Sequence, residues 1–219
     1  MFHPVHREWV GRQSPMTICA NWLQATTRQS KRSLIMDFTL HTIETAPEAI
    51  RPELEGAQKK FGAIPNLYRG LAESPAALKI YLHMSETLYK FGRLTPVEQQ
   101  VVYLSISAEN DCGYCVGAHS TLATMVNMPE EVLVELREKT TLSDLKLDAL
   151  RRFALSALQN RGGVPEEDLA TFAAAGYEQT HAIEVLTILG QKIISNYFNH
   201  LTDTPLDPMF APFAWQAGK

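Results

Sequence analysis

Two cysteines and a histidine are close enough in the sequence to act on one substrate. Cys112 and Cys115 have two residues between them, and His119 follows Cys115 by four. On a helix that begins near Asp111, residues three and four apart share a face, so the three side chains lie together. A helix N-terminus stabilises a thiolate, and a nearby imidazole can take the thiol proton. The spacing therefore predicts a redox-active dithiol, in which one thiolate attacks and the other closes a disulfide.

Other kinds of cysteine site fit this spacing less well. A structural zinc site needs four ligands, and the sequence offers no evident second Cys/His pair. Haem attachment requires a histidine directly after the second cysteine, where this chain has Val116. A thioredoxin-like motif would follow a strand in a βαβ setting, which is missing here. An inert pair of buried cysteines remains the structural alternative, and we expect no metal or other cofactor.

The elements that must position these residues are predicted to be helices. Apolar residues recur at helical spacings from Met36 onward, and no convincing run of residues reads as strands. Thr95 and Pro96 have the N-cap and first-turn signature of a helix start. The sequence thus predicts an all-α protein, with a turn at 64–66 and an extended Pro-rich tail over 204–212. The predicted helices span 47–61, 75–91, 96–108, 112–125, 128–139, 143–159, 165–174 and 178–200.

The composition is that of an ordinary soluble globular chain. Of its 219 residues, 45% are hydrophobic and 20% are charged, which excludes collagenous, low-complexity and mostly disordered proteins. A net charge of −4 argues against a nucleic-acid-binding surface over the whole molecule, and no apolar stretch is long enough for a bilayer. Three cysteines are too few for a secreted disulfide framework. We therefore expect a cytoplasmic protein that binds neither nucleic acid nor a membrane.

The first 35 residues differ from the remainder of the chain. They hold five basic residues and one acidic residue, whereas the other 184 hold 15 and 23. An Arg- and Ser-rich, acid-poor head is typical of organelle targeting, but a disordered tail, or translation from an upstream start before Met36, is the simpler explanation. Cys19 lies in this head as a stray thiol. We predict an extension over 1–35 and one all-α domain over 36–219.

Two adjacent motifs resemble those of a known superfamily. Residues 94–102 read LTPVEQQVV, and residues 107–120 read SAENDCGYCVGAHS. A Cys-x-x-Cys-x3-His motif on a helix that follows an apolar helix is similar to that of the alkyl hydroperoxidase D (AhpD)-like, carboxymuconolactone decarboxylase superfamily. The resemblance extends over roughly 38–213, because FGAIPN at 61–66 and NYFNHLTDTPLD at 196–207 are similar to its peroxidase-related branch.

The resemblance implies a role for each residue of the motif. Cys115 would be the peroxidatic thiol, Cys112 the resolving thiol, and His119 part of a proton relay. The family's relay also contains a glutamate twelve residues before the first cysteine, where this chain has Gln100. Glu98, on a different side of the same helix, is the substitute candidate. The same glutamate also stands at the third position of a capping box, which would give it a structural task.

The expected activity is that of a thiol-dependent (alkyl hydro)peroxidase or disulfide reductase, a peroxiredoxin-like antioxidant enzyme. A small peroxide would be the substrate, and an external dithiol, a lipoylated or thioredoxin-like protein, would regenerate the thiols. The resemblance also implies a homo-oligomer, a trimer or a hexamer. Alternatives are a non-catalytic redox sensor or assembly module, a carboxymuconolactone-type decarboxylase, and a metal-binding helical protein. Glu109 is a further carboxylate candidate, while Asn196 and His200 are expected to serve helix packing or capping.

Overall fold

The computed structural model describes residues 37–216, and from Thr39 onward the chain forms one compact unit. Within these residues there are helices and no strand, which confirms the all-α prediction. The predicted extension over 1–35, with Cys19, lies outside the described residues. The elements in chain order are η1 (Glu48–Ile50), α2 (Arg51–Phe61), α3 (Asn66–Leu71), α4 (Pro75–Phe91), α5 (Pro96–Glu109), α6 (Gly113–Met125), α7 (Glu130–Arg137), α8 (Leu145–Gln159), α9 (Glu166–Ala174), α10 (Gln179–Thr202) and η2 (Pro208–Phe213).

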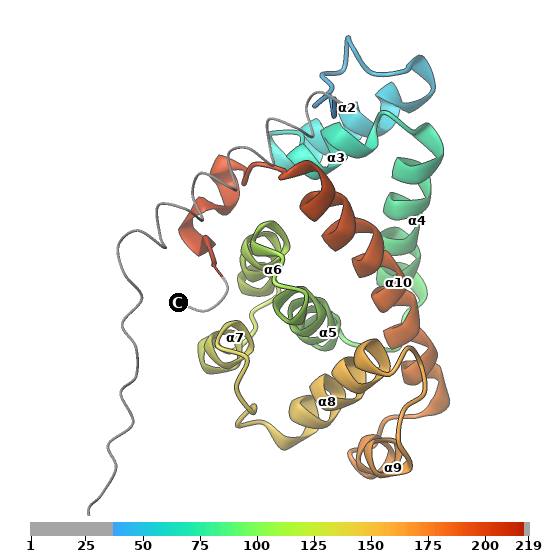
Figure 1. The fold of residues 1–219 in the computed structure, drawn as a ribbon, viewed down its shortest axis with the longest axis vertical. Helices are drawn as coiled ribbons and strands as arrows, with labels where there is room; N and C mark the ends of the chain where they lie inside the picture. The colour runs from blue at the N-terminus through green and yellow to red at the C-terminus, as the bar shows by residue number, and fades with distance from the viewer. Residues whose placement is uncertain (1–36, 217–219) are drawn as a thin grey trace, which may run out of the picture. The chain divides into compact units, whose positions relative to one another are not determined.

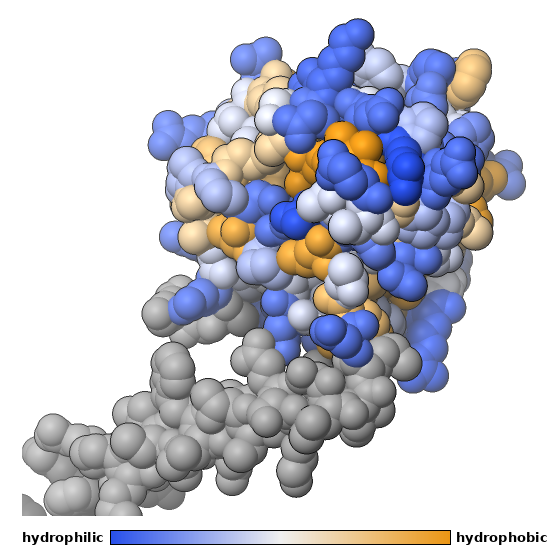
Figure 2. All heavy atoms as spheres, turned by 90° about the horizontal axis from the view of Figure 1, so that it is seen from above, coloured by the Kyte–Doolittle hydropathy of each residue, from blue (hydrophilic) through white to orange (hydrophobic). Residues whose placement is uncertain are grey.

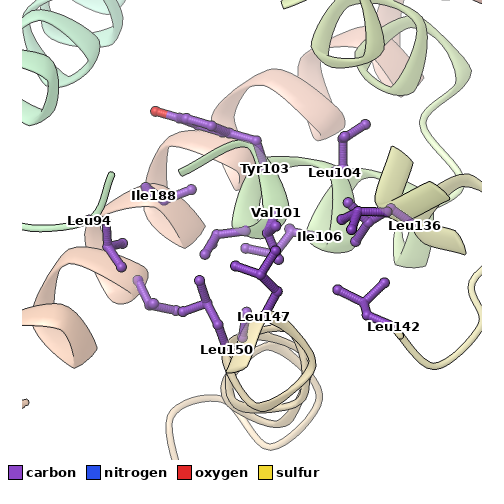
Figure 3. Close-up of a cluster of buried hydrophobic side chains, with 14 of the residues drawn as sticks. Leu94, Val101, Tyr103, Leu104, Ile106, Leu136, Leu142, Leu147, Leu150 and Ile188 are labelled. Carbon is purple, nitrogen blue, oxygen red and sulfur yellow. The ribbon is translucent and has the colours of Figure 1, made fainter. Parts of the chain in front are cut away.

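Helix α5 is the central element, and it packs against α6, α7, α8 and α10 (Figure 1). Its start is fixed by the predicted capping box, in which the Thr95 hydroxyl accepts from Glu98 N and the Glu98 carboxylate accepts from Thr95 N. A cap of this kind stabilises a helix by about 1 kcal/mol. Every residue from Val101 to Ala108 is buried. Figure 3 shows Val101 and neighbouring apolar side chains of α5 among leucines of α7 and α8.

The junction between α5 and α6 sets the start of the motif helix. Asp111 adopts a left-handed conformation, with φ of 52°, and thereby reverses the chain direction. The Cys112 backbone N–H then donates to the Ser107 carbonyl at 3.0 Å, which ties the turn back to α5. Helix α6 begins at Gly113, so Cys112 is its N-cap residue and not part of its first turn. The prediction was therefore wrong by one residue, within the usual uncertainty of a helix end.

Two short elements differ from the sequence predictions. The predicted turn at 64–66 leads directly into α3, where both carboxylate oxygens of Asp207 accept from Asn66 N at 3.1 Å. The predicted extended tail contains the 3-10 helix η2, which packs on α6. Contacts distant in sequence stabilise both segments, so local periodicity could not reveal them.

Helix α10 buries an unusual number of polar side chains. It packs against α4, α5, α6 and α8. Most long amphipathic helices turn polar residues toward solvent. The buried polar residues of α10 are Glu184, Gln191, Lys192, Ser195, Asn196 and Asn199.

The surface carries scattered apolar side chains. On the face seen in Figure 2, small apolar patches are separated by hydrophilic residues. Of the described helices, none is both long and apolar enough to cross a bilayer.

Candidate active site

The two motif cysteines are buried side chains in an apolar environment. Cys112 is 1% exposed and Cys115 is 2% exposed, and both are free thiols. They belong to a hydrophobic cluster that includes Tyr81, Tyr114 and Phe210. An apolar shell strengthens every electrostatic interaction with the sulfurs, because little water screens it.

Helix α10 presents three polar side chains to the thiols. The Asn199 amide Nδ2 donates to Cys115 Sγ at 3.2 Å and lies 3.9 Å from Cys112 Sγ. The fully buried Lys192 has its Nζ 5.8 Å from the centre of the Tyr103 ring. Asn196, also fully buried, accepts at its Oδ1 from Asn110 Nδ2 at 2.9 Å. The residues stand at positions i, i+4 and i+7 of one helix, which places them on one face.

These surroundings separate the two thiols electrostatically. Burial alone would raise the pKa of Cys115, but the hydrogen bond from Cys112, the positive charge of Lys192 and the Asn199 amide hold that pKa well below its ordinary value. The pKa of Cys112 is raised, first by its hydrogen bond to Cys115 and then by burial. These surroundings thus favour ionisation of Cys115 over ionisation of Cys112.

His119 lies one turn after Cys115 and is held as a neutral ring. Its Nδ1 is 2.9 Å from Gln100 Oε1, and its ring stacks on Tyr103 with centroids 4.4 Å apart. Burial, followed by the charge of Lys192, lowers the pKa of His119 well below its ordinary value. Because the amide oxygen of Gln100 accepts, Nδ1 carries the proton and Nε2 is the basic nitrogen.

Glu98 does not join this cluster, which corrects its expected place in a relay. Its Oε2 accepts from Thr95 N at 2.8 Å, while its Oε1 accepts from Tyr177 Oη at 3.0 Å and pairs with Lys146 Nζ at 3.0 Å. Burial opposes ionisation, but the bonds from Thr95, Lys146 and Tyr177 still lower the pKa of Glu98. The capping box therefore takes the carboxylate, and Gln100 is the α5 residue at His119.

Glu109 is also occupied elsewhere. Its Oε1 accepts from Gln159 Nε2 at 2.8 Å, so this half-buried carboxylate belongs to the contact between α5 and α8. No group of three His, Cys, Asp or Glu side chains within 37–216 is arranged to hold a metal ion.

The residues between the cysteines are fixed by the C-terminal segment. Tyr114 Oη donates to Asp207 Oδ2 at 2.6 Å and accepts from Leu67 N at 3.2 Å. A Cβ atom on Gly113 would lie 2.7 Å from the Trp215 carbonyl oxygen, closer than real contacts allow. Trp215 is itself held by a 2.9 Å bond from its Nε1 to the Arg137 carbonyl. The segment after α10, called the tail below, thus acts as a clamp that holds the start of α6 in place.

A surface cavity of about 760 Å³ opens beside this clamp. Gly113, Tyr114, Arg137, Leu206 and Trp215 contribute to its wall, and neither cysteine lines it. The sulfurs therefore lie behind the wall of this cavity rather than in it.

The sequence reasoning missed Lys192 and Asn199 and assigned Asn196 to packing. Their helical spacing was visible, but polar residues at such a spacing usually form a solvated face. Only the packing of α10 against α4, α5 and α6 shows that this face is buried.

Comparisons with known proteins agree with this fold. Residues 75–142, which include the whole thiol motif, match the carboxymuconolactone decarboxylase family. No match was found among the curated proteins.

Several solved structures are similar over most of the chain. An uncharacterized peroxidase-related protein with an AhpD core from Ralstonia eutropha JMP134 is 23% identical, with a TM-score of 0.69, covering 80% of this chain and 95% of that one. A peroxidase-related protein from Silicibacter sp. TM1040 is 18% identical, with a TM-score of 0.68 and coverages of 80% and 92%. The debrominase Bmp8, in complex with 2,3,4-tribromopyrrole, is 16% identical, with a TM-score of 0.68 and coverages of 81% and 95%. These likenesses show a shared fold.

Proposed function

Because the family match and the shared fold support an AhpD-like, carboxymuconolactone decarboxylase superfamily assignment, we propose that the chain is a thiol-dependent peroxidase. The observation that carries the proposal is the contact of Asn199 Nδ2 with Cys115 Sγ at 3.2 Å beside the buried charge of Lys192. An amide donor and a cation stabilise a thiolate, and the thiolate is the nucleophile in peroxide reduction. An inert structural cysteine has no need of either group.

The proposed cycle has three balanced steps. The Cys115 thiolate attacks the terminal oxygen of a hydroperoxide, so that an S–O bond forms, the O–O bond breaks, and the departing oxygen takes the electron pair and a proton to leave as an alcohol or water. The Cys112 thiol then attacks the sulfenic acid, which forms the disulfide and releases water. An external dithiol reduces the disulfide by exchange and is itself oxidised.

The different surroundings of the two thiols support these assignments. Cys115 has the lowered pKa, whereas Cys112 keeps the proton that the second step needs to release water. The neutral His119 can carry a proton through its Nε2 while Gln100 fixes the ring. Since both sulfurs are nearly unexposed, peroxide must enter when the covering residues open, and the C-terminal segment that contacts Gly113 and Gly117 of α6 is one such cover.

The regenerating dithiol and the homo-oligomer remain part of this proposal. A lipoyl arm or a thioredoxin-like active site can supply two thiols to one disulfide. The cavity beside Gly113 and Tyr114 is the nearest described opening for such a group.

Two experiments test the proposal. Stoichiometric hydrogen peroxide is added to the reduced protein, and mass spectrometry should detect a 112–115 disulfide; a fully reduced dithiol would contradict the proposal. Peroxide consumption is then followed with dithiothreitol or dihydrolipoamide as reductant. Repeated turnover separates an enzyme from a redox sensor, which reacts once and stops.

Other reactions of the fold are tested in the same assay. Bromide release from 2,3,4-tribromopyrrole, the compound bound by the debrominase Bmp8, is measured beside peroxide loss. Bromide release without peroxide turnover would argue for a dehalogenating enzyme. Activity on a carboxymuconolactone that survives Cys115→Ser would argue for a decarboxylase.

A further inference from the structure

The buried face of α10 contains three polar atoms without partners. Within the described residues, Lys192 Nζ, Asn196 Nδ2 and Asn199 Oδ1 are all buried and none has a hydrogen-bond partner. The ordinary expectation is that a buried polar atom is satisfied by protein or by water. Three unsatisfied atoms on adjacent turns of one helix are therefore available to a polar ligand that reaches the thiols.

The orientation of the two amides is fixed by their other bonds. Asn196 Oδ1 is occupied by Asn110 Nδ2 at 2.9 Å, which leaves its Nδ2 as a free donor. Asn199 uses Nδ2 on Cys115 Sγ at 3.2 Å, which leaves its Oδ1 as a free acceptor next to the sulfur. One acceptor and two donors, one of them cationic, thus adjoin the thiols.

The charge of Lys192 strengthens this indication. No described ion pair joins Lys192 to a carboxylate, so the anion that can balance its charge is the thiolate of Cys115. Its electrostatic influence is felt by Cys115, Cys112 and His119, of which only the thiols can become anions. A cation beside an attacking thiolate can also stabilise negative charge that develops on a second atom.

We propose that Lys192, Asn196 and Asn199 form a subsite that binds the two oxygen atoms of a small hydroperoxide. Asn199 Oδ1 accepts from the hydroxyl of the peroxide and holds its terminal oxygen at Cys115. Lys192 Nζ and Asn196 Nδ2 donate to the oxygen that departs. When the S–O bond forms and the O–O bond breaks, that oxygen takes the electron pair and a proton from the Lys192 ammonium, which solvent later replaces. The inference rests on the proposed peroxidase function.

The test compares two reagents that need the same thiolate. Iodoacetamide requires only an ionised, accessible sulfur, whereas hydrogen peroxide and tert-butyl hydroperoxide also require stabilisation of a departing oxygen. Both rates are measured at Cys115 by mass spectrometry, at a pH where alkylation has reached its plateau. The ratio of the peroxide rate to the alkylation rate then reports the subsite independently of thiol ionisation and of access.

The subsite predicts which variants change this ratio. Lys192→Met should lower it about a hundredfold, in the range for the loss of one preorganised donor. Asn196→Leu should lower it less, about tenfold, because Lys192 still donates to the departing oxygen. Methionine is close to lysine in size and apolar, so Lys192→Met should keep the packing of this buried position. The exposed Lys90→Met and Tyr197→Phe are matched controls and should leave the ratio unchanged.

Three other results would contradict either the subsite or the proposed function. An unchanged ratio in both α10 variants, with slower alkylation below the plateau, would overturn the subsite and leave α10 acting on the thiol alone. An original chain that is alkylated but inert to both peroxides would instead refute the proposed function. An unchanged Asn196→Leu ratio would mean that its amide holds only a water molecule, which would also overturn the three-residue subsite.

Discussion

Two buried polar clusters in this protein use their hydrogen-bonding atoms in opposite ways. At the start of α5, the carboxylate of Glu98 is bonded through both oxygens, to Thr95, Tyr177 and Lys146. On α10, Lys192 and its two asparagine neighbours each leave a buried atom without a partner among the described residues. In the first cluster both carboxylate oxygens have partners, whereas in the second each side chain leaves one polar atom without a partner.

This difference shows why residue type alone misidentifies a site. From the sequence, Glu98 lies near the dithiol motif and has the right chemistry for a proton relay. Lys192 lies far along the chain, and nothing in the sequence suggests that it contacts the thiols. The partners of each group reverse that ranking, because the Glu98 carboxylate is fully bonded within the fold, whereas the Lys192 ammonium has no hydrogen-bond partner among the described residues.

The largest loss of peroxide turnover is expected when the Cys115 sulfur is removed. Cys115→Ser should lower peroxide turnover by at least about a thousandfold, because it removes the nucleophile. Glu98→Gln, which keeps the shape of the side chain, should change turnover by less than about twofold. Peroxide consumption with dithiothreitol measures both. A large loss of turnover in Glu98→Gln, with stability retained, would return Glu98 to the catalytic cluster.

A smaller effect is expected where Gln100 is replaced by a glutamate. In Gln100→Glu, a carboxylate would accept from His119 Nδ1 and raise the pKa of that ring from its present low value. Turnover should rise roughly tenfold, below the usual range for a full acid–base group, and the pH–rate profile should gain an inflection from the more basic ring. An identical rate and pH profile would mean that His119 takes no part in proton transfer.

Removal of the Glu98 carboxylate at the start of α5 should lower the stability of the fold. Glu98→Ala leaves Thr95 N and Tyr177 Oη without their acceptor and removes half of the capping box. The free energy of unfolding should fall by about 1–3 kcal/mol. Urea denaturation measures this loss. Lys146→Ala is the comparison, because its partly exposed ammonium should contribute less than about 1 kcal/mol.

The smallest effect is a pH dependence at His119. Its pKa is lowered in the folded protein, so the unfolded chain binds this proton first, and stability is lost as the pH falls below the unfolded value near 6.5. Between pH 6.5 and 5.5 the loss from this one group should be about 1 kcal/mol. The difference between the original chain and His119→Phe, measured by urea denaturation at each pH, isolates it. Equal slopes would mean that His119 has the same pKa in the folded protein as in the unfolded chain.

The sequence was sufficient for most of the helical framework. Apolar periodicity located the eight longer helices, and the Thr95 and Glu98 signature correctly predicted a capping box. Helix α3 and η2 were not predicted, because the bonds from Asp207 to Asn66 and Tyr114 join segments far apart in the chain. Local patterns contain no information about such pairs.

Of the candidate site, only the residues of the thiol motif on α6 could be predicted from the sequence. The spacing of Cys112, Cys115 and His119 follows from helix geometry and could be read directly. The contribution of Lys192 and Asn199 depends on which face of α10 is buried, and that is decided by how the helix packs. A buried lysine is rare enough that sequence reasoning places it at the surface by default.

The clamp of the tail on Gly113 restricts how this motif can vary. Any other residue at that position would push its first side-chain carbon against the Trp215 carbonyl oxygen. A larger residue there would have to arise together with a rearranged C-terminal segment. Attempts to change the redox properties of the thiol pair by redesigning its two-residue spacer should therefore mutate the spacer and the C-terminal segment in the same library.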